Sequence, residues 1–179
     1  MNTYIVIDTG YFVELFKIPK RSSEQDSKEI IKRFGIAGKQ NYRLYIPIPV
    51  LVELGNHIAH VDNKETRRNL AIQFSELVKK GIDKNKPQIS ITAFPIEQEI
   101  SINSEELTFA NKLGDFIESF VAEFSQKGLG FTDAVVLLEA RKLHAKYKKF
   151  GKVHIWTTDR DLKHQEPDTE PDYFIGTRK

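Results

Sequence analysis

The 179-residue sequence contains no cysteine, which excludes disulfide bridges and thiolate metal sites. It has no apolar run of about 18 residues, the length that a membrane-spanning helix needs. The N-terminus shows neither the basic region nor the small-residue cleavage site of a secretory signal. These absences predict a protein of the reducing cytoplasm that does not engage a membrane.

The formal net charge is only +2, but the acidic residues are concentrated in one segment. Between Glu97 and Glu123, Lys112 is the one basic residue, and bases outnumber acids in the remainder of the chain. Such a remainder is compatible with a polyanionic substrate, although a solvated surface accounts for the same count. With 40% hydrophobic residues and neither a linker nor a repeat, the sequence predicts one globular domain over residues 1–179.

Four apolar runs predict the strands. The first lies within residues 4–9, where apolar residues are followed by the charged Asp8. This pattern predicts a buried strand that ends at a carboxylate. The later runs are residues 43–49, 88–95 and 153–157. A short apolar patch at residues 173–175 predicts a last edge strand.

Amphipathic or capped segments between these runs predict the helices. Pro49 suits the first turn of a helix, where its missing N–H costs little. Gly81 is predicted to end one helix, and Thr132 to cap another. The predicted helices are residues 10–16, 22–40, the segment from Pro49, 63–80, 104–127 and 132–150.

Strands that alternate with helices predict an α/β protein with a mostly parallel sheet. In such sheets the ligand site lies beyond the carboxyl ends of the strands. Asp8 follows the first strand, Glu53 lies in the first turns of the helix after the second, and Asp159 follows the fourth. Asp133 joins them from the first turn of its own helix, so all these acids are expected along one edge of the sheet.

Each of these acids has an ordinary structural explanation when it is taken alone. Asp8 and Asp159 could cap short helices or turns, and Glu53 and Asp133 could be first-turn acids that the helix dipole favours. Together, four carboxylates on one edge would repel one another strongly unless a divalent cation balanced them. Oxygen-only donors favour Mg²⁺ or Mn²⁺, and such a site suits metal-assisted hydrolysis of phosphodiester bonds.

Two other sets of residues could form a binding site. Glu53, His57 and His60 share a helix at a spacing that zinc ligands could use, but surface histidines explain the pattern better. Three lysines of the basic segment 141–152 lie opposite Asp133 on a helical wheel, which favours a solvated face over contact with RNA phosphates.

In their order and in the types of their acids, four segments resemble those of PIN-domain nucleases, and among these the toxin ribonucleases of the VapC kind. The segments are residues 4–9, 49–54, 131–140 and 155–162. The resemblance implies a three-layer α/β/α sandwich around a mostly parallel sheet, and a magnesium- or manganese-dependent endoribonuclease activity. It also implies that the four acids bind the metal and carry the catalysis. These residues are Asp8, Glu53, Asp133 and Asp159.

The resemblance adds two accessory residues and several partners. Thr157 would be a hydroxyl that orients the acids, and Asp161 matches a further acid of the last segment. RNA would be the substrate, and the family's members commonly form homodimers and, as toxins, are held inactive by an antitoxin protein.

Two features depart from the family pattern. Gly10 stands where a serine or asparagine usually follows, so a hydroxyl or amide near the metal is lost, and an enlarged helical segment at about 97–127 makes the chain longer than a compact toxin. Two other functions therefore stay open. One is a catalytically silent domain of the same fold that binds RNA or protein, and the other is a phosphatase that uses the same acids on small phosphoesters.

Overall fold

A four-stranded parallel sheet forms the centre of the protein. The computed structural model describes residues 2–83, 85, 88–93 and 113–177. The strands are β1 (Asn2–Ile7), β2 (Arg43–Pro47), β3 (Ile89–Thr92) and β4 (Gly151–Trp156). They lie in the order β3-β2-β1-β4, and each neighbouring pair is parallel. The predicted α/β class and parallel sheet are confirmed.

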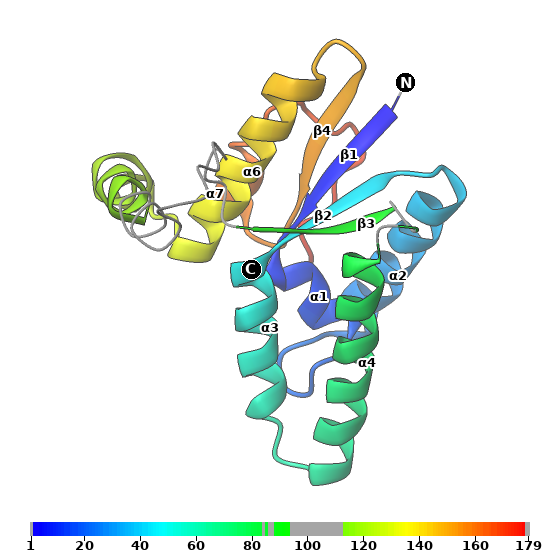
Figure 1. The fold of residues 1–179 in the computed structure, drawn as a ribbon. Helices are drawn as coiled ribbons and strands as arrows, with labels where there is room; N and C mark the ends of the chain where they lie inside the picture. Colours follow the sequence, from blue (N-terminus) through cyan, green and yellow to red (C-terminus); the bar gives the residue numbers. More distant parts are fainter. Residues whose placement is uncertain (1, 84, 86–87, 94–112, 178–179) are drawn as a thin grey trace.

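Helices connect the strands, as parallel pairing requires. The connecting helices are α1 (Thr9–Leu15) and α2 (Glu24–Lys39) before β2, α3 (Ile48–Ala59) and α4 (Lys64–Ile82) before β3, α6 (Phe131–Tyr147) before β4, and α7 (Arg160–Lys163) after it. Ser23 and Asn63 cap α2 and α4 by accepting hydrogen bonds from Asp26 N and Thr66 N, at or within one residue of the predicted starts of these helices. Figure 1 shows α3 and α4 side by side, extending away from the sheet.

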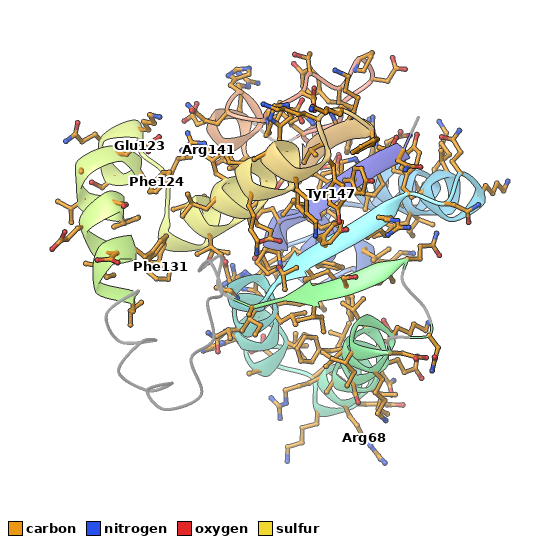
Figure 2. The ribbon with its side chains drawn as sticks, turned by 45° about the horizontal axis from the view of Figure 1, so that its top comes forward. Arg68, Glu123, Phe124, Phe131, Arg141 and Tyr147 are labelled. Atoms are coloured by element: carbon orange, nitrogen blue, oxygen red, sulfur yellow. The ribbon has the colours of Figure 1, made fainter. Side chains whose placement is uncertain are left out.

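Helices cover both faces of the sheet. Tyr4 of β1 stacks on Tyr147 of α6, with ring centroids 4.3 Å apart, and Tyr147 lies over the sheet in Figure 2. Trp156 of β4 contacts Tyr11 of α1 and Phe34 of α2. Because Tyr4 is in register with Val153 and side chains alternate along a strand, Tyr4 and Trp156 point to opposite faces. The layers are therefore α/β/α, and residues 4–7 are buried on both sides.

The described part of the predicted 104–127 helix packs beside α6. Residues 113–119 are helical, and η1 (Phe120–Phe124) and η2 (Ser125–Lys127) follow; residues 104–112 lie outside the described chain. Phe116 meets Phe131 edge to face at 4.7 Å. Arg141 of α6 donates to Glu123 at 2.9 Å, and Figure 2 shows this pair between the two elements. The bonds from Arg141 and Lys127 lower the pKa of Glu123 to about 2.

The outer edge of β4 is covered by side chains rather than by another strand. Asp168 Oδ2 accepts a hydrogen bond from Val153 N at 2.9 Å, and Glu166 Oε2 accepts one from Ile155 N at 3.1 Å. The buried ammonium of Lys163 donates to Ile155 O at 2.9 Å. These contacts satisfy backbone groups that an edge strand would otherwise expose.

The predicted strand at residues 173–175 is wrong. These residues have no regular secondary structure and pair with none of the described strands, because the carboxylates of Glu166 and Asp168 already occupy the edge of β4. Instead, Phe174 O accepts a hydrogen bond from Tyr11 Oη at 2.5 Å.

Two further details differ from expectation. Gly81 does not end α4, which continues to Ile82. A Cβ at Gly81 would lie 2.7 Å from Ile91 Cγ1, so the glycine permits close packing of α4 on β3. Phe150, the last residue of the helix predicted at 132–150, lies beyond the end of α6 and is exposed. Among the described helices, none is long and apolar enough to cross a lipid bilayer.

Asp168→Ala should lower the free energy of unfolding by about 1–3 kcal/mol, because it leaves Val153 N on the strand edge without its acceptor and removes the ion pair with Lys152. Urea denaturation would measure this. Asp172→Ala is the matched control, since that side chain belongs to the same segment but is exposed, and it should change stability by less than about 0.5 kcal/mol. Equal effects of the two substitutions would contradict this account of the edge.

Candidate functional site

The four predicted acids line one cavity of about 700 Å³. Asp8 follows β1 and caps α1, and Asp159 follows β4 and caps α7. Glu53 lies on α3, and Asp133 lies in the first turn of α6. The strands are parallel, so their carboxyl ends meet at one edge of the sheet, and the cavity lies there. The ordinary capping roles of Asp8 and Asp159 are therefore real, and both residues also face the cavity.

Asp8 is the most deeply buried of the four, with 6% of its surface exposed. Its Oδ2 accepts hydrogen bonds from Thr157 Oγ1 at 2.8 Å and from Gly10 N at 3.4 Å. Burial, and next the negative charge of Asp133, raise the pKa of Asp8 to about 7, although these hydrogen bonds oppose the rise. A carboxylate at this position is thus costly to ionise unless positive charge is nearby.

Thr157 connects two of the acids. It is fully buried; its hydroxyl donates to Asp8 Oδ2 and accepts from Asp159 N at 2.9 Å. Asp159 in turn accepts from Leu162 N through Oδ1 at 2.8 Å. Thr157 therefore fixes the orientation of Asp8 relative to the backbone of Asp159, the geometry that a positioning hydroxyl would need.

Asp133 is held by the backbone that begins its own helix. Gly130, rather than the predicted Thr132, is the N-cap of α6, and Gly130 N donates to Asp133 Oδ2 at 2.9 Å. A Cβ at Gly130 would lie 3.0 Å from the same oxygen, so a glycine suits the close approach of this carboxylate. Burial raises the pKa of Asp133 despite the Gly130 bond, and the negative charges of Asp159 and Glu53 raise it further.

Glu53 accepts a hydrogen bond from Thr9 Oγ1 at 3.0 Å through Oε2. Its Oε1 lies 3.8 Å from His57 Nε2. Burial and next the nearby charge of Arg21 lower the pKa of His57. His60 is exposed, and its Nδ1 lies 2.7 Å from Asn56 O. Glu53 and His57 are therefore near each other, whereas the ring of His60 contacts the backbone of its own helix.

The donor chemistry fits a hard divalent cation, but the arrangement is not a compact ligand cluster. No three of the His, Asp and Glu side chains that the structure describes are close enough together to hold a metal ion. Every one of the four acids also accepts a hydrogen bond from a donor of the protein. Mg²⁺ is commonly bound through one or two carboxylates and keeps several waters, so a three-carboxylate cluster is not a requirement. Metal ligation stays a prediction.

Asp161 does not join the others. It lies in α7, it is exposed, and it is not among the residues that line the cavity.

The last described segment of the chain forms a wall that sequence analysis missed. Ile175 and Gly176 line the cavity. Thr177 anchors this wall, because its N and Oγ1 donate to Asp26 Oδ1 at 3.0 and 2.8 Å. Asp26 is buried, yet in the sequence it resembles an ordinary acid of a first helical turn. No periodic signal in the sequence connects residues 26 and 177.

Two positively charged side chains also line the cavity. Lys20 and Arg21 are both exposed lining residues, and Lys20 pairs with Asp62 at 2.7 Å. The cavity thus has carboxylates at the ends of the strands and positive charge at its margin, a distribution that a bound cation together with a polyanion would match.

No model of a known protein family matches the chain, and no curated protein matches it either. Any functional conclusion must therefore come from the residues and their geometry.

Asp8→Asn should stabilise the metal-free protein at pH 8 by up to about 4 kcal/mol. The pKa of Asp8 is about 7 when folded, above its ordinary value of 3.8, so folding favours the protonated form and the wild type loses stability as the pH rises through this interval. Thermal unfolding in chelator at pH 5 and pH 8 would test this. The difference between variant and wild type should fall to roughly 2 kcal/mol at pH 5, where only part of the interval between the two pKa values has been passed. The same difference at both pH values would refute the assignment.

Thr157→Val should destabilise the fold by about 1–3 kcal/mol, because it removes both the donor to Asp8 and the acceptor for Asp159 N. Thr157→Ser keeps the hydroxyl and should recover most of the loss. Chemical denaturation of the two variants would measure the effect, and a serine variant as unstable as the valine variant would show that the methyl group matters instead.

Proposed function

We propose that this protein is a metal-dependent endoribonuclease with a PIN-like fold, which hydrolyses RNA phosphodiester bonds in the cavity lined by Asp8, Glu53, Asp133 and Asp159. One observation carries the proposal. A buried carboxylate at the end of β1, that of Asp8, lies close enough to Asp133 for the negative charge of Asp133 to raise its pKa, and both line the same cavity as the two remaining acids. This concentration of negative charge favours the binding of a divalent cation.

Asp8 and Asp133 are the proposed main ligands of Mg²⁺ or Mn²⁺. When bound, such a cation would make a hydroxide available at neutral pH and would stabilise charge on the phosphate. Thr157 holds the carboxylate of Asp8 in place, and Thr9 holds that of Glu53. Asp159 faces the cavity while its Oδ1 caps α7, so one oxygen is fixed by the protein.

The resemblance supports the nuclease assignment over other chemistry at such a site. The four segments that carry it follow the family's order, and the parallel α/β/α fold agrees with what it implies. A toxin role of the VapC kind, with an antitoxin partner and a homodimer in the cytoplasm, belongs to the same proposal and has the resemblance alone behind it.

A silent domain that binds RNA or protein is the second candidate. Two observations favour it: the described residues contain no compact cluster of three metal-binding side chains, and Gly10 contributes no polar side chain beside Asp8. This candidate predicts binding without cleavage.

The deciding experiment incubates the purified protein with a mixed pool of single-stranded and structured RNAs in Mg²⁺, Mn²⁺ or chelator. The nuclease proposal expects cleavage that requires the metal and falls on the order of 100-fold or more in Asp8→Asn and Asp133→Asn. Asp115→Asn is the control, because Asp115 is exposed and lies outside the residues that line the cavity.

Each outcome separates the candidates. Cleavage that persists in chelator or in Asp8→Asn would refute a metal site at these acids. RNA binding without cleavage in either metal would favour the silent domain. Turnover of small phosphoesters with no effect on RNA would favour a phosphatase that uses the same carboxylates.

A further inference from the structure

Gly10 and Thr158 compete for one space beside Asp8. A Cβ built on Gly10 would overlap Thr158 Oγ1 and would lie 3.2 Å from Thr158 Cβ. Both residues line the acidic cavity, and Gly10 N donates to Asp8 Oδ2. The hydroxyl of Thr158 therefore occupies the volume into which a side chain at position 10 would project.

The neighbouring threonine hydroxyls are already used by the acids. Thr9 donates to Glu53 and Thr157 donates to Asp8, and Thr157 is also fully buried. Thr158 follows Thr157 directly but is only half-buried, so its side chain is accessible from the cavity. It adds a hydroxyl to the cavity that the four carboxylates also line.

A phosphate that lies beside the acids would be bound by such a donor. Phosphodiester oxygens accept hydrogen bonds but donate none, and carboxylates that hold a metal ion can only accept as well, whereas the hydroxyl of Thr158 can donate. We infer that Thr158 is a substrate-binding residue whose hydroxyl donates a hydrogen bond to a phosphate oxygen of RNA in this cavity, and that Gly10 is a glycine because any side chain there would displace this hydroxyl. The inference rests on the proposed function, since that function identifies RNA as the ligand.

The test measures the affinity of a fluorescein-labelled single-stranded RNA by anisotropy, with Ca²⁺ as the divalent cation so that binding is followed without relying on turnover. Thr158→Val keeps the shape of the side chain and removes its hydroxyl. It should weaken binding by roughly 5- to 10-fold, as expected for one hydrogen bond to a charged group. Thr158→Ser keeps the hydroxyl and should bind within about twofold of the wild type.

A second pair of variants moves the hydroxyl between the two chain segments. Gly10→Ser should weaken binding as much as Thr158→Val does, because the introduced side chain and that of Thr158 cannot share the space. Combining Gly10→Ser with Thr158→Gly clears the space and supplies a hydroxyl from position 10, and should restore most of the affinity. Melting temperatures of all variants ensure that folded proteins are compared.

Wild-type affinity in Thr158→Val would overturn the inference, as would a Thr158→Ser variant as weak as Thr158→Val or a wild type that does not bind RNA. These outcomes differ from failure of the proposed function. If Thr158→Val weakens binding but no metal supports cleavage, the nuclease proposal fails and Thr158 remains an RNA contact of a silent domain.

Discussion

The rest of this structure depends on one constraint, the free-energy cost of ionising the buried carboxylate of Asp8 at the end of β1. Asp8 follows a strand that is covered on both faces, so its charge is far from bulk water, and Asp133 adds a like charge across the cavity. Two groups donate hydrogen bonds to this carboxylate: Thr157 Oγ1 after β4 and Gly10 N at the start of α1. These donors lower the cost without removing it, and a bound cation, as we propose, would lower it further.

Packing of the hydrophobic core offsets the free-energy cost of burying this carboxylate. β1 lies between β2 and β4, and its residues Ile5, Val6 and Ile7 are fully buried. Aromatic contacts hold α6 to one face and α1 and α2 to the other. The helices that make these contacts also position two of the acids, because Asp8 caps α1 and Asp133 lies in the first turn of α6. Packing of the core therefore sets the relative position of the acids.

Patterns of local origin were predictable from the sequence, and features that depend on distant segments were not. Alternating apolar runs and helical patterns correctly predicted the parallel α/β class, and Asn63 marked a helix start because a cap is a contact over three residues. The helix predicted from residue 22 is capped one residue later, by Ser23. Gly81 failed as a stop signal because its role is set by Ile91 on another element. The strand expected at 173–175 is absent because the carboxylate of Asp168 occupies the edge of β4, a pairing that no sequence periodicity encodes.

The rule that places sites at strand ends correctly predicted that the four acids share one cavity, but neither the cavity wall at Ile175 nor the distances between the acids follow from it.

Gly10 illustrates why a residue should be judged by the space around it rather than by its position in a motif. In the sequence, a glycine after Asp8-Thr9 suggests a lost polar group and thus a weakened site. In the structure, that space is filled by the hydroxyl of Thr158, which arrives from the opposite end of the chain on the segment between β4 and α7. Because β1 and β4 are neighbours and end at the same edge, a group that one connection lacks can be supplied by the other. The polar groups available in the cavity therefore depend on both segments, the one after β1 and the one after β4. A comparison of one sequence motif at a time would miss this dependence.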